Sequence, residues 1–213
     1  LIQLFAEQIL GLSEKYDINI PWYIMCSPLN LHATVTHFRE NNFYGLGEEN
    51  LRFFAQGVMP ATDFEGNLLL ASMDSLALSP NGHGGSLKAL IDSGSIADMA
   101  KRGIEHVSYF QVDNPLVTIL NPLFIGLHDL QKSDMSSRSL TKTGPFEKLG
   151  NFVSIGDRVT IIEYSDLPEE KALETEDDGR IKYRAGSPAI HVLRRDFIEQ
   201  FARGENKLPY HRA

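Results

Sequence analysis

Residues 20–26 read Ile-Pro-Trp-Tyr-Ile-Met-Cys, and this continuous apolar run decides the expected fold. An apolar run without polar alternation predicts a strand that is covered on both faces of a sheet. Pro21 lies near its start, where a strand tolerates proline. Two further apolar runs, at residues 51–56 and 107–112, predict buried strands of the same kind.

Helical spacing of apolar residues alternates with these strands along the first half of the chain. The pattern breaks at Gly94, so the helix expected there is interrupted. In the second half short β segments dominate, and Gly156-Asp157 marks a tight turn between two of them. Strand–helix alternation followed by a β meander favours a mixed-sheet α/β domain. Helices are expected at residues 1–16, 30–41, 86–101, 121–132, 166–174 and 196–203, further strands at 60–62, 68–71, 135–143, 150–155, 158–164 and 190–193, and a loop at 77–85.

The composition is that of a globular protein and narrows the classes of function. The chain has 213 residues, of which 42% are hydrophobic and 23% charged, so it can build a sizeable core. A net charge of −8 argues against a non-specific nucleic-acid binder. No apolar run approaches the roughly 20 residues that cross a membrane. The single cysteine, Cys26, and the lack of a signal peptide after Leu1 favour a reducing, cytoplasmic compartment.

A glycine-rich loop at residues 79–85 is the first candidate for ligand binding. It contains Gly82, His83 and Gly84 and leads into an expected helix. Glycines let the backbone approach a ligand closely, and a helix N-terminus favours an anion. A plain turn that caps the helix explains the same residues, and the loop lacks the spacing of a P-loop.

An acidic residue follows the third apolar strand. Asp113 and Asn114 come directly after residues 107–112. Ligands bind at the carboxyl ends of strands in an open α/β sheet, and a carboxylate there can hold Mg²⁺ that bridges phosphates. The alternative is an Asp-Asn-Pro turn that only ends the strand.

Two charged residues in the second half are further candidates. Lys142, before a Gly-Pro turn, would neutralise phosphate charge or lie at the surface. Glu163 ends an apolar strand, where a carboxylate suits hydrogen bonds to sugar hydroxyls. The acidic run at residues 169–178 is expected to be a solvated loop.

Nine short motifs follow one another along nearly the whole chain. They are Pro-Trp-Tyr-Ile-Met-Cys-Ser at residues 21–27, Phe38 with Gly45-Leu46, Phe-Phe-Ala-Gln-Gly at 53–57, Pro-Asn-Gly-His-Gly-Gly at 80–85, Val-Asp-Asn at 112–114, Lys-Thr at 142–143, Glu-Tyr-Ser at 163–165, Ala-Gly-Ser at 185–187 and Leu-Pro-Tyr at 208–210. Each motif is short, but their common order is specific. The series resembles the UDP-sugar pyrophosphorylase family, and within it the eukaryotic UDP-N-acetylhexosamine pyrophosphorylases.

The resemblance implies both a fold and a reaction. The fold is a Rossmann-like α/β nucleotidyltransferase domain of the glycosyltransferase-A kind, with a mixed central sheet, incomplete at both ends, and residues 1–213 as a single partial catalytic domain. The reaction is that of a uridylyltransferase, which forms a UDP-sugar and pyrophosphate from UTP and a sugar 1-phosphate, N-acetylglucosamine 1-phosphate being favoured. Catalysis would rest on positioning and on charge neutralisation, with Mg²⁺ as cofactor and no covalent intermediate.

The resemblance also implies roles for residues at matching positions. Asp113 and Lys142 are the catalytic candidates, Asp113 as the Mg²⁺ ligand and Lys142 near phosphate. The expected partners are UTP, the sugar 1-phosphate and the UDP-sugar, without nucleic acid or membrane. The nucleotide is expected at Ser27, Pro28, Gln56, Gly82, His83 and Gly84, and the sugar at Asn114, Glu163, Gly186 and Ser187.

The chain departs from the family pattern at several of these positions. Pro28 replaces a glycine and lacks the N–H that would contact the base. His83 gives Gly-His-Gly, which resembles the UDP-glucose pyrophosphorylases, while Arg184 and Ser187 replace two asparagines. Two alternatives therefore stay open: a UTP–glucose-1-phosphate uridylyltransferase and a non-catalytic nucleotide-sugar binding fragment. The family's upstream glycine-rich triphosphate loop is not in this sequence, so we expect the chain alone to be inactive.

Overall fold

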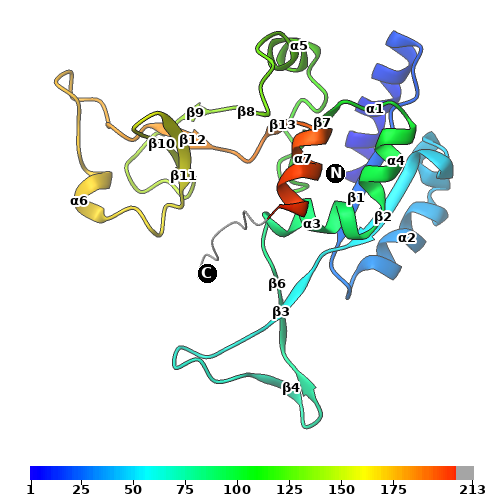
Figure 1. Ribbon diagram of the computed structural model, residues 1–213, viewed down its shortest axis with the longest axis horizontal. Coiled ribbons are helices and arrows are strands. Elements are labelled where there is room, and N and C mark those ends of the chain that lie inside the picture. Colours follow the sequence, from blue (N-terminus) through cyan, green and yellow to red (C-terminus); the bar gives the residue numbers. More distant parts are fainter. Residues whose placement is uncertain (205–213) are drawn as a thin grey trace. The chain divides into compact units, whose positions relative to one another are not determined.

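The computed structural model describes residues 1–204, which belong to two compact units (Figure 1). Unit 1 comprises Leu1–Val107 and the segment that begins at Arg194, and unit 2 comprises Ser108–Leu193. No described helix is long and apolar enough to span a membrane. The Leu-Pro-Tyr motif at residues 208–210 lies outside the described residues.

Unit 1 confirms most of the elements predicted for the first hundred residues. The helix predicted at residues 86–101 is interrupted as expected, because Gly94 adopts a left-handed φ of 73°. The elements of this unit are α1 (Ile2–Tyr16), β1 (Trp22–Cys26), α2 (Leu31–Glu40), the 3-10 turns η1 (Asn42–Gly45) and η2 (Glu48–Asn50), β2 (Leu51–Ala55), β3 (Val58–Pro60), β4 (Leu70–Ser72), β5 (Ser75–Leu76), β6 (Leu78–Pro80), α3 (Gly85–Asp92), α4 (Ser95–Lys101) and α7 (Arg195–Arg203).

Aromatic side chains form much of the core of unit 1. Phe38 of α2 is 1% exposed and packs edge-on against Trp22 of β1 and Phe53 of β2, at ring-centroid distances of 5.7 and 4.9 Å. Phe5 of α1 packs edge-on against Trp22 at 6.4 Å. The apolar spacing of both helices therefore serves to cover the β1–β2 pair, and burying each large side chain stabilises the fold by roughly 1.5–3 kcal/mol.

The strands β1 and β2 pair in parallel and in register up to Cys26 opposite Ala55. A parallel pair needs a crossover connection, which α2 supplies. The two strands end at the same level, and the Gln56 N–H donates to the Cys26 carbonyl oxygen at 2.7 Å. Ser27 and Gln56, which directly follow the two strands, therefore lie close to each other.

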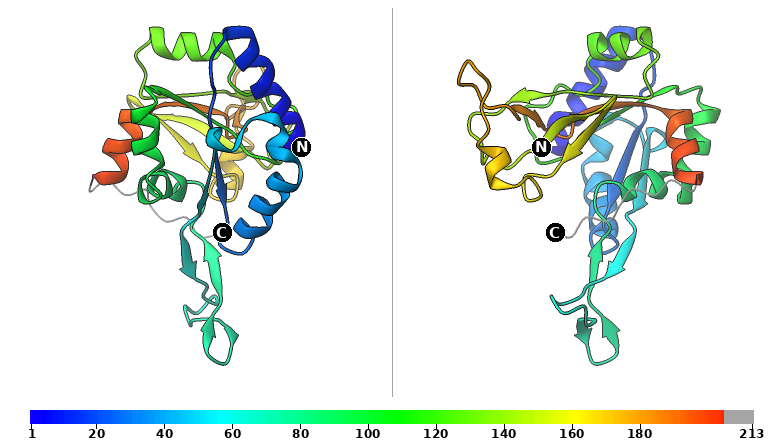
Figure 2. Two further views of the ribbon diagram at one scale, coloured as in Figure 1. Left: turned by 90° about the vertical axis from the view of Figure 1, so that its right-hand side faces the viewer. Right: turned by 60° about the vertical axis from the view of Figure 1, so that its left-hand side comes forward.

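Within unit 1 a long two-stranded ribbon connects β2 to α3 and extends away from the helices of the unit (Figure 2). Within it β3 pairs with β6, and β4 with β5, all antiparallel. Residues 63–67, between the strands predicted at 60–62 and 68–71, form a turn that a Thr62–Leu68 bridge closes. The loop predicted at residues 77–85 is wrong in its first half, because Leu78–Pro80 pairs with β3 as a strand.

Unit 2 consists mainly of short strands. Its largest sheet has the order β11-β10-β12-β9, with all neighbours antiparallel. In a separate three-stranded sheet β13 lies between β7 and β8, and the buried His191 of β13 shares a 2.8 Å hydrogen bond with Ser137. The elements are β7 (His106–Tyr109), α5 (Pro122–Leu130), β8 (Met135–Ser137), β9 (Leu140–Thr141), β10 (Gly150–Ile155), β11 (Arg158–Ile162), α6 (Glu169–Ala172), β12 (Ala185–Ser187) and β13 (His191–Arg194), of which β7 and β13 cross between the units.

The mixed α/β class is confirmed, but the predicted mixed central sheet is not one continuous sheet. The described residues form five separate sheets of two to four strands. The strand predicted at residues 20–26 is also less covered than expected: the first four residues of β1 are half-buried, because among the described residues β2 alone pairs with it. The strand predicted at residues 107–112 stops at Tyr109, where the backbone leaves the sheet for a turn.

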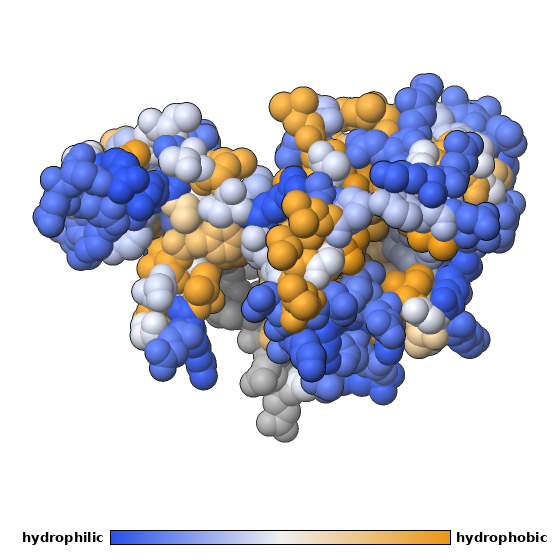
Figure 3. Space-filling model, turned by 90° about the horizontal axis from the view of Figure 1, so that it is seen from above, coloured by the Kyte–Doolittle hydropathy of each residue, from blue (hydrophilic) through white to orange (hydrophobic). Residues whose placement is uncertain are grey.

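Large apolar side chains reach the surface, and Figure 3 shows hydrophobic patches among hydrophilic ones on one face of the molecule. On the ribbon Phe64 and Met73 are almost fully exposed, and on α5 Leu123 and Leu130 are largely exposed. A two-stranded ribbon without a third layer gains little from burial. Backbone hydrogen bonds and tight turns therefore hold the ribbon together.

Candidate functional site

The nucleotide residues predicted in unit 1 gather at the carboxyl end of the β1–β2 pair. Gln56, directly after β2, donates from Nε2 to the Gly82 carbonyl oxygen at 3.1 Å. This hydrogen bond joins the strand end to the glycine loop across 26 residues of sequence. The structure therefore brings together two of the predicted nucleotide contacts, Gln56 and Gly82. They lie at the carboxyl end of the strands, where α/β proteins bind ligands.

Ser27 and Pro28 begin the turn that follows β1. The Ser27 Oγ accepts from the backbone N–H of Asn30 at 3.2 Å, and its carbonyl oxygen accepts from Leu31 at 3.0 Å. Pro28 is exposed and has no N–H to donate. Ser27 therefore helps to start α2, and Pro28 can contact a base only through its ring or its carbonyl oxygen.

The exposed turn at residues 82–84 leads into α3. Gly82 has a φ of 74°, in the left-handed region that favours glycine. The Gly85 N–H donates to the Gly82 carbonyl oxygen at 3.2 Å, and the Ser86 hydroxyl donates to the His83 carbonyl oxygen at 2.6 Å. These two bonds hold the turn against the first turn of the helix.

Asn81 belongs to this loop, and the sequence did not single it out. Its Oδ1 is buried and accepts no hydrogen bond from the described residues. A Cβ added to Gly57 would lie 2.5 Å from Asn81 Nδ2, and one added to Gly85 would lie 2.0 Å from Asn81 Oδ1. The Asn81 amide therefore occupies the space that two glycines leave open. The pattern of one glycine directly after β2 and another at the start of α3 is the signal that could have revealed this packing.

We expect Gly85→Ala to displace the Asn81 amide and to lower the free energy of unfolding by roughly 1–3 kcal/mol, the usual cost of overpacking. Chemical denaturation of the chain measures the loss. Asn81→Ala removes the obstructing group, so the double variant should recover part of it. Gly11→Ala in α1 is the matched control, because nothing lies within 4 Å of its added Cβ. Strictly additive losses from Gly85→Ala and Asn81→Ala would show that the two residues do not pack together.

Asp113 lies in an exposed turn of unit 2. The prediction that it directly follows the strand is wrong, because β7 ends at Tyr109 and the Asn114 N–H donates to the Gln111 carbonyl oxygen at 3.4 Å. The Asn114 side chain is used locally as well, since its Oδ1 accepts from the Leu116 N–H at 3.1 Å. Asp113 itself makes no hydrogen bond or ion pair with any residue that the structure describes.

A protein-only metal site is absent from residues 1–204, where no three His, Cys, Asp or Glu side chains cluster. Magnesium needs no such cluster, because it is commonly held by one or two carboxylates together with substrate phosphates. The carboxylate of Asp113, which is exposed and unpaired among the described residues, suits a magnesium ion that is shared with substrate phosphates.

Four predicted residues of unit 2 gather on the β11-β10-β12-β9 sheet. Ser187 of β12 lies opposite Gly150 of β10. A Cβ added to Gly150 would lie 3.6 Å from Glu163 Oε1, and one added to Gly186 would lie 3.1 Å from Lys142 Cγ. Glu163 and Ser187 therefore lie beside Gly150 on one face of the sheet, whereas Lys142 lies beside Gly186 on the opposite face, because successive residues of a strand point to opposite faces.

Lys142 is 5% exposed, so the alternative that it lies at the surface is wrong. Its Nζ donates to Asn151 Oδ1 at 2.7 Å and to the Pro145 carbonyl oxygen at 3.1 Å. Burial lowers the pKa of Lys142, and the nearby Glu147 carboxylate partly opposes this. No described carboxylate forms an ion pair with Lys142. A buried ammonium without a counter-ion suits an anionic ligand.

Asn151 is the residue of this cluster that the sequence reasoning missed. It is fully buried, accepts from Lys142 and donates from Nδ2 to the Ile162 carbonyl oxygen at 3.2 Å. Buried polar groups are almost always hydrogen-bonded, so an asparagine inside an otherwise apolar strand at residues 150–155 was the available signal.

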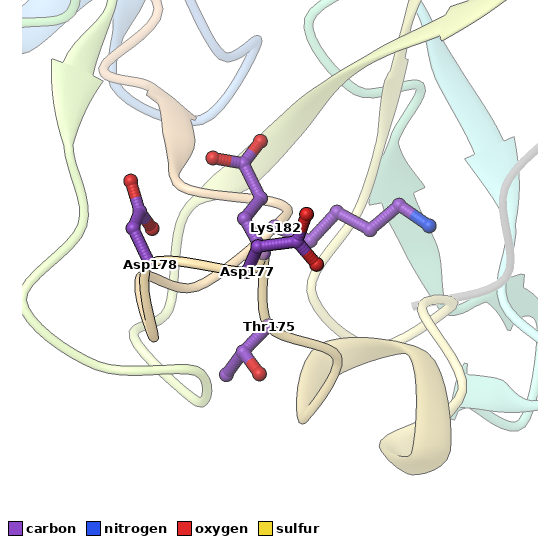
Figure 4. Close-up of a pocket in the computed structure, with 5 residues that line it drawn as sticks. Thr175, Asp177, Asp178 and Lys182 are labelled. Atoms are coloured by element: carbon purple, nitrogen blue, oxygen red, sulfur yellow. The ribbon is translucent and has the colours of Figure 1, made fainter.

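The acidic run at residues 169–178, predicted as a solvated loop, begins instead with the short helix α6, and its exposed residues 175–178 line a shallow pocket (Figure 4). Asp178 pairs with Arg180 and Glu176 with Arg184, so these carboxylates already have partners. In Figure 4 the Lys182 side chain extends away from Asp178. None of the predicted site residues lines this pocket, whose lining residues are Thr175, Glu176, Asp177, Asp178 and Lys182.

Comparison with known sequences gives matches along most of the chain. A family model described as UTP–glucose-1-phosphate uridylyltransferase matches residues 1–187. The chain is 38% identical over 203 residues to a protein of Schizosaccharomyces pombe and 35% identical over 220 residues to one of Saccharomyces cerevisiae, both described as UDP-N-acetylglucosamine pyrophosphorylases. These matches cover 94% and 99% of the chain but 43% and 45% of the relatives. The chain thus spans less than half the length of these curated relatives.

A solved structure agrees with the sequence matches. It is that of an Entamoeba histolytica protein described as a UDP-N-acetylglucosamine pyrophosphorylase, with a TM-score of 0.88 and 31% identity over 99% of this chain and 54% of that one. The resemblance inferred from nine ordered motifs is confirmed, and the chain belongs to the UTP–glucose-1-phosphate uridylyltransferase family, that of the UDP-sugar pyrophosphorylases.

Proposed function

We propose that this chain is part of the catalytic domain of a UDP-sugar pyrophosphorylase. The full-length protein joins UTP and a sugar 1-phosphate into a UDP-sugar and releases pyrophosphate. N-acetylglucosamine 1-phosphate is the favoured substrate, because the similar proteins carry names of that activity. The proposal extends to a Rossmann-like glycosyltransferase-A-type fold, to residues 1–213 as one partial domain and to a cytoplasmic location.

The buried, unpaired ammonium of Lys142 is the observation that carries the proposal. A cation that is removed from water without a carboxylate partner is costly unless an anion joins it. Phosphate groups of the substrates supply that charge. Glu163, which lies on the same sheet as Lys142, can accept hydrogen bonds from sugar hydroxyls.

The reaction needs positioning and charge neutralisation rather than a protein nucleophile. A phosphate oxygen of the sugar 1-phosphate attacks the α-phosphorus of UTP, and the bond to the departing pyrophosphate breaks. Lys142 offsets negative charge on the phosphates, and Asp113 would hold Mg²⁺, which would supply further charge neutralisation. Ser27, Pro28, Gln56 and the turn at residues 82–84 contact the nucleotide, and Asn114, Glu163, Gly186 and Ser187 contact the sugar.

Pyrophosphate release by the full-length protein tests the proposal. The assay supplies UTP, Mg²⁺ and, in separate reactions, the 1-phosphates of N-acetylglucosamine, N-acetylgalactosamine and glucose. We expect the fastest release with N-acetylglucosamine 1-phosphate, and chromatography identifies the UDP-sugar formed. A lack of pyrophosphate release with all three sugar 1-phosphates would refute the enzymatic proposal.

A second candidate function rests on the Gly82-His83-Gly84 turn. It resembles the corresponding turn of the UDP-glucose pyrophosphorylases, so preference for glucose 1-phosphate in the same panel would favour that enzyme instead. This chain by itself is expected to show no turnover. Calorimetric titration of the chain with UDP-N-acetylglucosamine then separates a binding fragment, which releases or absorbs heat, from one that binds nothing.

A further inference from the structure

One buried amide links two of the proposed site residues in unit 2. Asn151 lies in β10 and has no exposed surface. Its Oδ1 accepts from Lys142 Nζ at 2.7 Å, and its Nδ2 donates to the carbonyl oxygen of Ile162 at 3.2 Å. Ile162 is the last residue of β11 and precedes Glu163 directly. The Asn151 side chain therefore joins the lysine after β9 to the strand end that leads into the glutamate.

We propose that Asn151 is a positioning residue, whose side-chain amide holds the Lys142 ammonium beside the end of β11 and so fixes the place of the phosphate contact. The catalytic meaning of this role rests on the proposed function of Lys142 and Glu163. The structural part of the proposal, that Asn151 holds the Lys142 ammonium in place, does not depend on the proposed function.

An amide suits this role better than a carboxylate. It accepts a hydrogen bond from the ammonium without cancelling its charge, so the positive charge stays available for a phosphate. Two of the three ammonium N–H groups are used, by Asn151 and by the Pro145 carbonyl oxygen, which leaves one donor for a ligand. An aspartate at position 151 would instead form a buried ion pair and compete with the substrate for the same cation.

The backbone around Lys142 further limits the conformations that its side chain can adopt. The Lys142 N–H donates to the Arg184 carbonyl oxygen at 2.9 Å, and Gly186 leaves the space that the lysine side chain crosses. The charged group that acts on Lys142 is Glu147 in the following loop, whose carboxylate accepts from the Thr143 N–H at 2.6 Å. The Arg184 guanidinium pairs with Glu176. Glu163 lies after β11, on the far side of β10. Asn151 is thus the one side chain among the described residues that hydrogen-bonds the Lys142 ammonium.

The first test is independent of activity and uses the chain itself. Nuclear magnetic resonance of ¹³Cε-labelled lysine follows the ionisation of Lys142 with pH, and its signal is assigned by its disappearance in Lys142→Met. We expect Asn151→Asp to raise the pKa of Lys142 above its wild-type value, because a carboxylate within hydrogen-bond distance stabilises the charged form. Asn151→Leu, of similar volume, should lower it, because the ammonium loses an acceptor. An unchanged titration in both variants would overturn the proposal.

The second test measures catalysis by the full-length protein. Both variants should lower kcat/KM, by on the order of 10²-fold for Asn151→Leu, since displacement of a charged group by about 1 Å can have that effect. With Asn151→Asp the KM for the phosphate-bearing substrates should rise most, and the alkaline limb of the pH profile should move upward. Unaltered kcat/KM in both variants would also overturn the proposal. A wild-type protein without activity would refute the proposed function alone and leave the ionisation result standing.

Asn121→Ala is the matched control for general loss of stability. Asn121 also lies in unit 2, and its Oδ1 also accepts one hydrogen bond, from the Phe124 N–H at 3.0 Å at the start of α5. Its removal should lower the melting temperature as a lost helix cap does. It should leave the Lys142 titration and the pH profile unchanged.

Discussion

Replacing Asp113 by asparagine is expected to lower the kcat of the full-length protein by roughly 10²–10³-fold, the usual cost of removing one preorganised electrostatic contact. The substitution keeps the shape of the side chain and removes only its charge, so Mg²⁺ would lose the carboxylate that is proposed to hold it. The concentration of Mg²⁺ that gives half-maximal rate should rise in parallel, and Mn²⁺ should restore part of the rate. Steady-state kinetics at several metal concentrations measures both effects.

Stability should hardly change in Asp113→Asn, within about 0.5 kcal/mol, because the exposed carboxylate makes no hydrogen bond or ion pair with the residues that the structure describes. Asp157→Asn is the matched control, since Asp157 is likewise an exposed aspartate in a turn of unit 2. It should leave kcat and the metal requirement unaltered. Near-normal turnover of Asp113→Asn at limiting Mg²⁺ would mean that the metal is held by other residues.

Replacing Lys142 by methionine is expected to lower kcat/KM by roughly 10²–10³-fold. Methionine keeps much of the length of the buried side chain but carries no charge, so negative charge on the phosphates is no longer offset. Because burial lowers the pKa of Lys142, the wild-type rate should fall with rising pH earlier than the ordinary lysine value of about 10.4 would give. Since the ammonium is the form proposed to act on the phosphates, this loss is expected as an alkaline limb of the pH profile, and it should disappear in Lys142→Met.

The same variant should fold about as well as the wild type. Removing a buried charge relieves a desolvation cost, while Asn151 Oδ1 loses its donor, and the two effects oppose each other. Denaturation curves measure the balance. The matched control is Lys148→Met, which changes an exposed lysine six residues further along the same segment. Equal activity of the two methionine variants would exclude a phosphate role for Lys142.

The sequence predicted elements well wherever local pattern alone determines them. The helices α1 and α2 and the strands β1, β2, β10 and β11 follow from apolar spacing, and Gly156 marks the turn between the last two. The break at Gly94 followed from a residue that adopts a left-handed φ without strain. These features depend on near neighbours in the chain, which the sequence shows directly.

Pairing between distant segments was the part that the sequence could not supply. The strand β6 lies at the start of a stretch, residues 77–85, that is rich in turn-forming residues, and only its register against β3 makes it a strand. The strand β7 ends before Asp113, and where it ends depends on its pairing with β13. The division of the strands into five sheets likewise depends on pairing between distant segments. Tertiary context overrides local β propensity in such cases.

The candidate site divides in the same way. Motif order identified Gln56, Lys142, Glu163 and Gly186, because residue types at matching positions carry the resemblance. Asn81 and Asn151 escaped notice, because their importance comes from what surrounds them in space: two glycines for the first, and an ammonium and a strand carbonyl for the second. A buried asparagine differs from an exposed one only through such neighbours.

The ribbon formed by β3, β4, β5 and β6 has a consequence for how this chain tolerates change over evolutionary time. Its side chains contribute little to the free energy of folding, since most face solvent and its coherence comes from the peptide backbone. Substitutions there meet almost no steric resistance, apart from prolines that would remove a paired N–H. The ribbon can therefore diverge freely in sequence while keeping its shape, whereas the glycines at its base, which Asn81 closes off, cannot.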